Sequence, residues 1–238
     1  MGVKCMNLLV CGCSHSAGSE IEAPRHPGSP DKAFGAHLKN ILQFDNYVNL
    51  AGPGFSNQWI YHTAVEYLET LKHPEEWFVI IGWTNASRMP VYCYEKNEIV
   101  HLCPNHLDLS IYGRGIQKAY DHLYGTILPI HTSIQTEHTR IIGMQSILKQ
   151  LKIPYLFFDS VLSNHEHSRT NLLDLSRYYE FNQRDKTFWR NYQINFWDND
   201  DRWAYHAPES YHQFWATKLA EFITQNNLLT HTQNDAII

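Results

Sequence analysis

Ser14 and His206 are the two residues of this 238-residue chain whose types and surroundings best suit nucleophilic chemistry. Ser14 follows the compact apolar run 7–13 (NLLVCGC), so it is expected in a rigid loop at the end of a buried strand. A serine held in this way becomes a nucleophile when a neighbouring base removes its proton. On its own, however, a Gly-X-Ser at a strand end is more often a turn than a nucleophile.

The segments that must position these residues alternate between strand-like and helix-like patterns. Buried strands are predicted by short apolar runs at 7–13, 47–50, 77–82 and 154–158. Helical spacing of apolar residues occurs at 33–44, 56–71, 119–151 (interrupted by Pro129) and from Pro208 to about residue 225. This alternation predicts an α/β fold, a three-layer α/β/α (flavodoxin-like) sheet of mostly parallel strands with helices on both faces. Ligands of such sheets bind beyond the carboxyl ends of the strands, where Ser14 falls.

The length of the chain favours one domain with decorations, and we predict a single domain over residues 1–238. Residues 86–118 show no regular spacing of apolar residues and contain Pro90 and Pro104, which predicts an insertion folded over the surface. Residues 160–201 alternate irregularly between aromatic and polar residues. They are expected to form short helices and loops around the rim of the site.

The composition limits the partners. The chain has 19 basic and 24 acidic residues, a formal net charge of −5, and no run of like charges, so nucleic acid is not expected as a partner. No apolar stretch approaches the roughly 18 to 20 residues of a membrane-spanning helix, so no membrane association is expected. The five cysteines come without a secretory signal, which favours a reducing, cytoplasmic setting.

Residues 10–20 (VCGCSHSAGSE) resemble the first block of the SGNH, or GDSL, hydrolase superfamily, in which Gly-Asp-Ser precedes a small residue and a glycine. The resemblance makes Ser14 the nucleophile and places Cys13 where the family usually has aspartate. Residues 49–54 (NLAGPG) resemble the second block, whose glycine N–H contributes to the oxyanion hole, and Gly54 is the matching position. The resemblance implies no metal and no organic cofactor.

The sequence Gly82-Trp83-Thr84-Asn85 stands in place of the third block, Gly-X-Asn, whose side-chain amide is a further oxyanion donor. Strict spacing puts Thr84 at the donor position, whereas a shift of one residue puts Asn85 there. We favour Asn85 for its N–H donor and keep Thr84 as a competitor. A preorganised donor of this kind is worth roughly 10² to 10³ in rate. For either residue the alternative is a helix cap at the strand end.

The segment 206–216 (HAPESYHQFWA) resembles the family's His-Pro-Ser-X-X-Gly-His-X-X-X-Ala, which makes His206 the base. The family places an aspartate three residues before this histidine to orient the imidazole, but here that residue is Trp203. Among the nearby acids we choose Asp201. A Ser-His dyad is also open, because a backbone carbonyl can hold the proper tautomer of the histidine.

Two alternatives from other residues were weighed. Glu209 and His212 would form an acid-X-X-His pair, although packing or hydrogen bonding inside the helix explains His212 better. The aromatic run 178–197 could stack on sugars or bases, but it lacks interleaved basic residues. A cover over the core is the favoured interpretation of this run.

Two groups of residues carry ligands that zinc prefers. They are Cys11 with Cys13 and His15, and His165 with His167. Neither group is completed by a second Cys-X-X-Cys or histidine pair, and alternating cysteines along a strand are common in cores. We therefore predict no metal site.

Together these matches predict a serine hydrolase of SGNH type that cleaves a small-molecule or glycan ester, or transfers its acyl group, through a Ser-His(-Asp) mechanism. The alternative is a catalytically inactive SGNH-fold protein that binds a ligand or a protein partner, which the missing aspartates at Cys13 and Trp203 favour. The chain also looks similar to uncharacterised SGNH-like proteins of tailed bacteriophages, which would place it in the host cytoplasm. These residues do not identify the acyl group or the alcohol of the substrate, or the oligomeric state of the protein.

Overall fold

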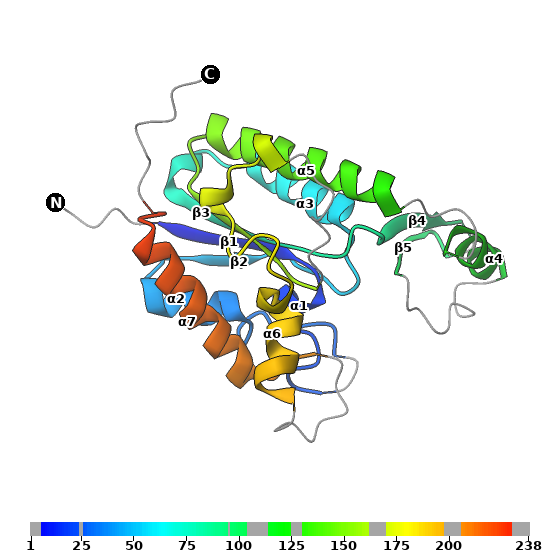
Figure 1. Ribbon diagram of the computed structural model, residues 1–238, viewed down its shortest axis with the longest axis horizontal. Helices are drawn as coiled ribbons and strands as arrows, with labels where there is room; N and C mark the ends of the chain where they lie inside the picture. Colours follow the sequence, from blue (N-terminus) through cyan, green and yellow to red (C-terminus); the bar gives the residue numbers. More distant parts are fainter. Residues whose placement is uncertain are drawn as a thin grey trace.

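The main sheet consists of four parallel strands in the order β2-β1-β3-β6 (Figure 1). The computed structural model describes residues 6–23, 26–94, 96–103, 114–124, 130–161, 170–197 and 206–229. The strands are β1 (Asn7–Gly12), β2 (Tyr47–Asn49), β3 (Trp77–Trp83) and β6 (Tyr155–Asp159). All four lie where the apolar runs of the sequence predict them.

Helices cover both faces of this sheet, which confirms the predicted three-layer α/β/α arrangement (Figure 1). One face carries α2 (Phe34–Leu42) and α7 (Glu209–Gln225), and the other carries α3 (Asn57–Glu69) and α5 (Ile130–Gln150). The remaining helical elements are α1 (Ser14–Ala17), η1 (Pro74–Glu76), α4 (Arg114–His122), η5 (Thr170–Leu172), η6 (Leu175–Arg177), η7 (Arg184–Lys186) and α6 (Phe188–Asn195).

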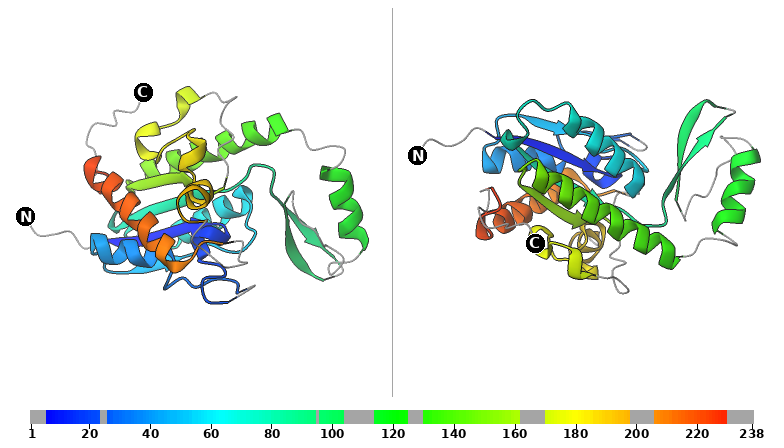
Figure 2. Two further views of the ribbon diagram at one scale, coloured as in Figure 1. Left: turned by 60° about the horizontal axis from the view of Figure 1, so that its bottom comes forward. Right: turned by 90° about the horizontal axis from the view of Figure 1, so that it is seen from above.

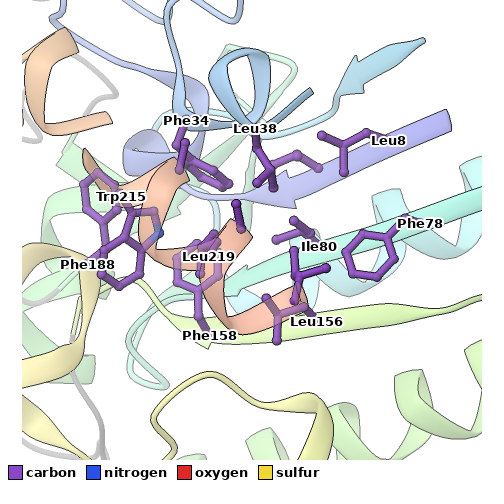
Figure 3. Packing of buried hydrophobic residues seen from close by; sticks show 14 of the residues in the cluster. Leu8, Phe34, Leu38, Phe78, Ile80, Leu156, Phe158, Phe188, Trp215 and Leu219 are labelled. Atoms are coloured by element: carbon purple, nitrogen blue, oxygen red, sulfur yellow. The ribbon is translucent and has the colours of Figure 1, made fainter. Parts of the chain in front are cut away.

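The core is divided between the two faces because successive side chains of a strand point in opposite directions. The face toward α2 and α7 holds Leu8, Val10, Phe78, Ile80, Leu156 and Phe158, with Phe34, Phe188, Trp215 and Leu219 from the helices (Figure 3). The face toward α3 and α5 holds Leu9, Cys11, Val79, Ile81 and Phe157. Each large apolar side chain buried in this way contributes about 1.5–3 kcal/mol. Phe188 and Tyr192 belong to the first cluster, so this part of the aromatic run covers the core, as predicted.

The segment between β3 and α5 leaves the sheet and forms an antiparallel hairpin, β4 (Met89–Cys93) and β5 (Glu98–Leu102), followed by α4 (Figure 2). Cys93, Val100, Leu102 and Ile116 make a small apolar cluster of their own. Pro90 is tolerated in β4 because a two-stranded ribbon leaves one edge of each strand unpaired. The ring of His101 on β5 packs 5.0 Å from the ring of Phe55, which joins the hairpin to the loop before α3.

The helical ranges predicted to begin at residue 56 and at Pro208 match the starts of α3 and α7. The Ser56 Oγ accepts a hydrogen bond from the Trp59 N–H at 3.3 Å and caps α3. Pro208 is the N-cap of α7, and Asn226 is its C-cap. None of the helices in the described part of the chain is long and apolar enough to cross a membrane.

Candidate active site

Ser14 lies at the carboxyl end of β1, where the strand stops at Gly12 and α1 begins. Its carbonyl oxygen accepts hydrogen bonds from the N–H groups of Gly18 and Ser19, which close the short helix tightly. As the first residue of the helix, Ser14 has an N–H outside the helical hydrogen-bond ladder. The residue is 6% exposed, so its hydroxyl sits in a sheltered turn rather than on a mobile loop.

His206 is brought to this turn from the segment before α7. Its ring centroid lies 4.9 Å from that of His15, the neighbour of Ser14 in the chain. Burial lowers the pKa of His15 well below its usual range, and electrostatic interactions with His206 and Arg88 lower it further. His15 therefore stays neutral and packs as an aromatic ring, stacked 5.3 Å from Trp189 of α6.

The imidazole of His206 is held by an acid that the sequence analysis does not identify. The His206 Nδ1 lies 2.9 Å from the Glu20 Oε2, and both side chains are mostly buried. An ionised carboxylate only accepts hydrogen bonds, so Nδ1 is the donor, and in the neutral form of the imidazole Nε2 then carries no proton. Asp201, the predicted orienting acid, lies outside the described residues. The signal that could have indicated Glu20 is that it is the first acidic residue after Ser14.

The loop that carries Glu20 is pinned by its own backbone. Gly18 ends α1 in the left-handed conformation (φ 69°), and the Ser29 N–H donates to the carbonyl oxygen of Ala17 at 3.1 Å. The Ser19 Oγ donates to the carbonyl oxygen of Pro27 at 2.6 Å, and the Glu20 N–H donates to that of His26 at 3.1 Å. The chain thus folds back on itself and fixes the direction of the Glu20 side chain.

Replacing Gly18 by alanine is expected to lower the free energy of unfolding by about 1–3 kcal/mol. A side chain there must adopt φ 69°, and its Cβ would lie 2.8 Å from the carbonyl oxygen of Ser29. Urea denaturation measures the effect. Gly143→Ala in α5 is the matched control, because its Cβ would meet no atom closer than the Tyr61 Oη at 3.4 Å. The control should be neutral or gain up to about 1 kcal/mol, and equal effects of the two substitutions would contradict the pinned loop.

The loop predicted to supply an oxyanion donor lies against the end of β1. The Gly52 N–H donates to the carbonyl oxygen of Gly12 at 3.2 Å, two residues before Ser14. Gly54 has φ 72°, a conformation that favours glycine. A Cβ built on Gly54 would lie 3.5 Å from the Cβ of His101, so the hairpin borders this loop.

Thr84 and Asn85, the competing third donors, follow directly on β3. The Thr84 N–H donates to the Asn57 Oδ1 at 2.7 Å, and the Asn57 Nδ2 donates to the Thr84 carbonyl oxygen at 2.8 Å. The Thr84 Oγ1 is buried and has no hydrogen-bond partner among the described residues. The Asn85 Oδ1 accepts from the N–H and the hydroxyl of Ser87 at 2.9 and 2.7 Å, and these bonds use only the oxygen of its amide. Both residues therefore retain a donor suited to the predicted role.

His212 and Glu209 have separate partners. The His212 Nδ1 accepts a hydrogen bond from the Phe34 N–H at 3.1 Å, and its buried ring stacks on that of Phe34. The Glu209 Oε1 lies 3.7 Å from the His37 Nε2 instead. The structural role predicted for His212, as a hydrogen-bonding residue inside the helix, is confirmed.

A buried acidic group lies behind the strand ends. The Tyr178 hydroxyl donates to the Asp159 Oδ1 at 2.6 Å, at the end of β6. Burial raises the pKa of Glu137 on α5 to about 8; the Asp159 charge also raises it, while the Asn57 amide and the Arg140 guanidinium lower it. The Asn57 side chain also holds the backbone of Thr84 at the candidate site.

The ligand sets considered for zinc have no support in the described part of the chain. Cys11 and Cys13 are buried in the apolar core, and burial raises the pKa of Cys11 to about 12. His165 and His167 lie outside the described residues. One group of metal-type ligands does come together among the described residues, at the surface before β3, and consists of His73, Glu75 and Glu76.

A hollow of about 670 Å³ lies at the opposite, amino ends of the strands. Its lining includes Asn7 at the start of β1, Trp77 at the start of β3, and the charged residues Asp31 and Lys39. None of the predicted catalytic or oxyanion residues contributes to it.

Comparison with known proteins gives a family and likenesses to solved structures, among them two esterases. No curated protein matches the chain. A psychrotrophic esterase, EstA from Pseudoalteromonas sp., is similar at a TM-score of 0.49 and 12% identity, over 92% of this chain and 97% of that one. An acetyl xylan esterase, AlAXEase, is similar at a TM-score of 0.46 and 12% identity, over 91% and 98% of the two chains. The chain belongs to the family of unknown function DUF6071, which matches residues 25–235.

Proposed function

We propose that this protein is a serine hydrolase that cleaves a carboxylic ester, with Ser14 as nucleophile and His206 as general base. The observation that carries the proposal is the placement of His206. Its ring packs against His15 beside Ser14, and the hydrogen bond at Nδ1 leaves Nε2 as the basic nitrogen. A serine at a strand end and a histidine of fixed tautomer are the parts that nucleophilic acyl transfer requires.

In the proposed reaction, the Ser14 Oγ attacks the carbonyl carbon while its proton passes to the His206 Nε2. The carbonyl oxygen becomes an oxyanion, and the N–H groups of Ser14 and Gly54 donate to it together with Asn85 or Thr84. The tetrahedral intermediate collapses, the alcohol leaves with the proton from His206, and an acyl-serine remains. Water, deprotonated by the same nitrogen, then releases the carboxylic acid. Small-molecule or glycan esters are the proposed substrates, and a second alcohol in place of water would give acyl transfer.

The proposal is tested by labelling with a fluorophosphonate probe, which reacts far faster with an activated serine than with an ordinary one. Peptide mapping by mass spectrometry should locate the label on Ser14. Labelling should disappear in Ser14→Ala and fall strongly in His206→Ala.

The matched control for this experiment is Ser16→Ala in the same turn. The Ser16 Oγ is buried and has no hydrogen-bond partner among the described residues, so its removal costs little and should leave labelling intact. A folded protein that takes no label and hydrolyses no nitrophenyl ester would contradict the proposal. That result would instead favour an SGNH-fold binding protein, consistent with Cys13 in place of the usual aspartate.

A further inference from the structure

We infer that Glu20 is the positioning acid of this site, so that Ser14, His206 and Glu20 form a triad whose nucleophile and acid lie close together in the chain. The inference rests on the proposed function and deepens it. It assigns the orienting role to an acid close behind the nucleophile in the chain, rather than to one shortly before the histidine.

The contact between the two side chains has the geometry of a charge-assisted hydrogen bond. The Glu20 Oε2 and the His206 Nδ1 are 2.9 Å apart, and the side chains are 11% and 19% exposed, respectively. Water screens such a pair much less than it screens a surface ion pair. The acid therefore fixes both the direction of the ring and its tautomer.

The backbone conformation at Glu20 fixes the direction of this side chain. Glu20 has φ 61°, a left-handed conformation that costs a residue other than glycine roughly 1–2 kcal/mol. The hydrogen bond from its N–H to the His26 carbonyl oxygen holds it there, one residue beyond the Ser19–Pro27 contact. Strain of this kind persists where the surrounding structure enforces it, and it is concentrated at functional sites.

In the described part of the chain, the neighbouring titratable groups do not take the place of Glu20. His15 from α1 faces the ring but is held neutral, Arg88 adds only positive charge, and the His212 Nδ1 is occupied by the Phe34 N–H. Glu22, two residues further along the loop, points to a different partner, with its Oε1 2.8 Å from the Lys32 Nζ. Glu20 is thus the described carboxylate that stabilises a positive charge on His206.

The role of Glu20 in the reaction follows from this contact. Nδ1 keeps its proton and donates it to Glu20, while the proton of the Ser14 hydroxyl moves to Nε2. The imidazolium that results is stabilised by the carboxylate, which itself stays ionised throughout. The same proton then passes from Nε2 to the leaving alcohol, so no other proton carrier is needed.

The kinetic test compares Glu20→Gln and Glu20→Asp with Glu22→Gln, the control on the same loop, using a nitrophenyl ester. Glu20→Gln should lower kcat by ~10²- to 10⁴-fold with little change in KM. It should also move the acidic limb of the pH profile to lower pH, because the histidine loses an opposite charge. Glu20→Asp, which keeps the charge, should restore part of kcat, and Glu22→Gln should behave as wild type.

A second measurement needs no substrate. Histidine-ring NMR on the wild type and Glu20→Gln, with His206→Gln for assignment, should show an Nδ1-protonated His206 only in the wild type. Its titration midpoint should fall in the variant.

An unchanged midpoint and tautomer would overturn the role of Glu20, as would near-wild-type kcat in Glu20→Gln while Ser14→Ala and His206→Ala are inactive. If Glu20→Gln keeps near-wild-type kcat while Ser14→Ala and His206→Ala are inactive, the proposed hydrolase function is still supported. If NMR shows the pair but the wild type cleaves no ester and takes no fluorophosphonate, the positioning contact stands and the proposed function fails.

Discussion

Replacing either Ser14 or His206 by alanine is expected to lower kcat for nitrophenyl ester hydrolysis by ~10³-fold or more, without unfolding the protein. Either change removes the nucleophilic route, and only oxyanion stabilisation and substrate binding remain. Because the two residues act as a unit, the double variant should be no slower than the single variants by more than a few-fold. Steady-state kinetics with one ester and all three variants measures this.

Two controls make the result specific. Ser16→Ala should keep kcat near that of the wild type, since its hydroxyl has no described partner. Circular dichroism should show each variant folded, because the core lies on strands and helices that the substitutions do not enter. If the effects of the two single variants multiplied in the double variant, Ser14 and His206 would be acting independently, contrary to the proposed mechanism.

The second large effect concerns stability and comes from Glu137. Burial raises the pKa of its carboxyl from 4.5 to about 8 in the folded protein, so the folded state binds a proton more tightly than the unfolded state. The stabilising contribution is full below the unfolded value and is lost as the pH rises through about 8. At about 1.4 kcal/mol per pKa unit, the loss is on the order of 3–5 kcal/mol across this window.

Glu137→Gln should remove this loss, because a neutral amide has no proton to give up. Urea unfolding at about pH 5 and about pH 9 should therefore show the variant gaining stability relative to the wild type at the higher pH. Glu69→Gln at the end of α3 is the control, since Glu69 is exposed and its removal should leave the pH dependence unchanged. Parallel curves for the wild type and Glu137→Gln would contradict the burial of an acid at this position.

The strands and the main helices could be predicted because their apolar residues repeat with the period of each element. The run WFVIIG is buried on both faces as β3, and Ser56 and Pro208 mark the starts of α3 and α7. The hairpin β4–β5 could not be predicted in the same way. Pro90 and the mixed polar residues interrupt the alternation of apolar and polar residues that would predict strands. The hairpin packs around a separate small apolar cluster instead.

The residues of the candidate site likewise differ in whether the sequence could predict them. Ser14 and His206 stand beside recognisable elements, and the resemblance of the motifs around Ser14, Gly54 and His206 to a known family pointed to these three residues. Glu20 could not be predicted in this way, because its contact with His206 depends on how the loop after Gly18 folds back. Backbone hydrogen bonds set that fold, and they leave a much weaker signal in the sequence than the spacing of apolar residues does. The choice between Thr84 and Asn85 likewise depends on side-chain direction and stays a prediction.

Trapping the acyl-enzyme tests the central claim most directly. Wild type mixed with nitrophenyl acetate and quenched in acid within the first turnover should carry the mass of one acetyl group, and peptide mapping should place it on Ser14. The Ser14→Ala variant should carry none, and the Ser16→Ala variant should match the wild type. Hydrolysis without a trapped adduct, or an adduct on another residue, would contradict Ser14 as the nucleophile.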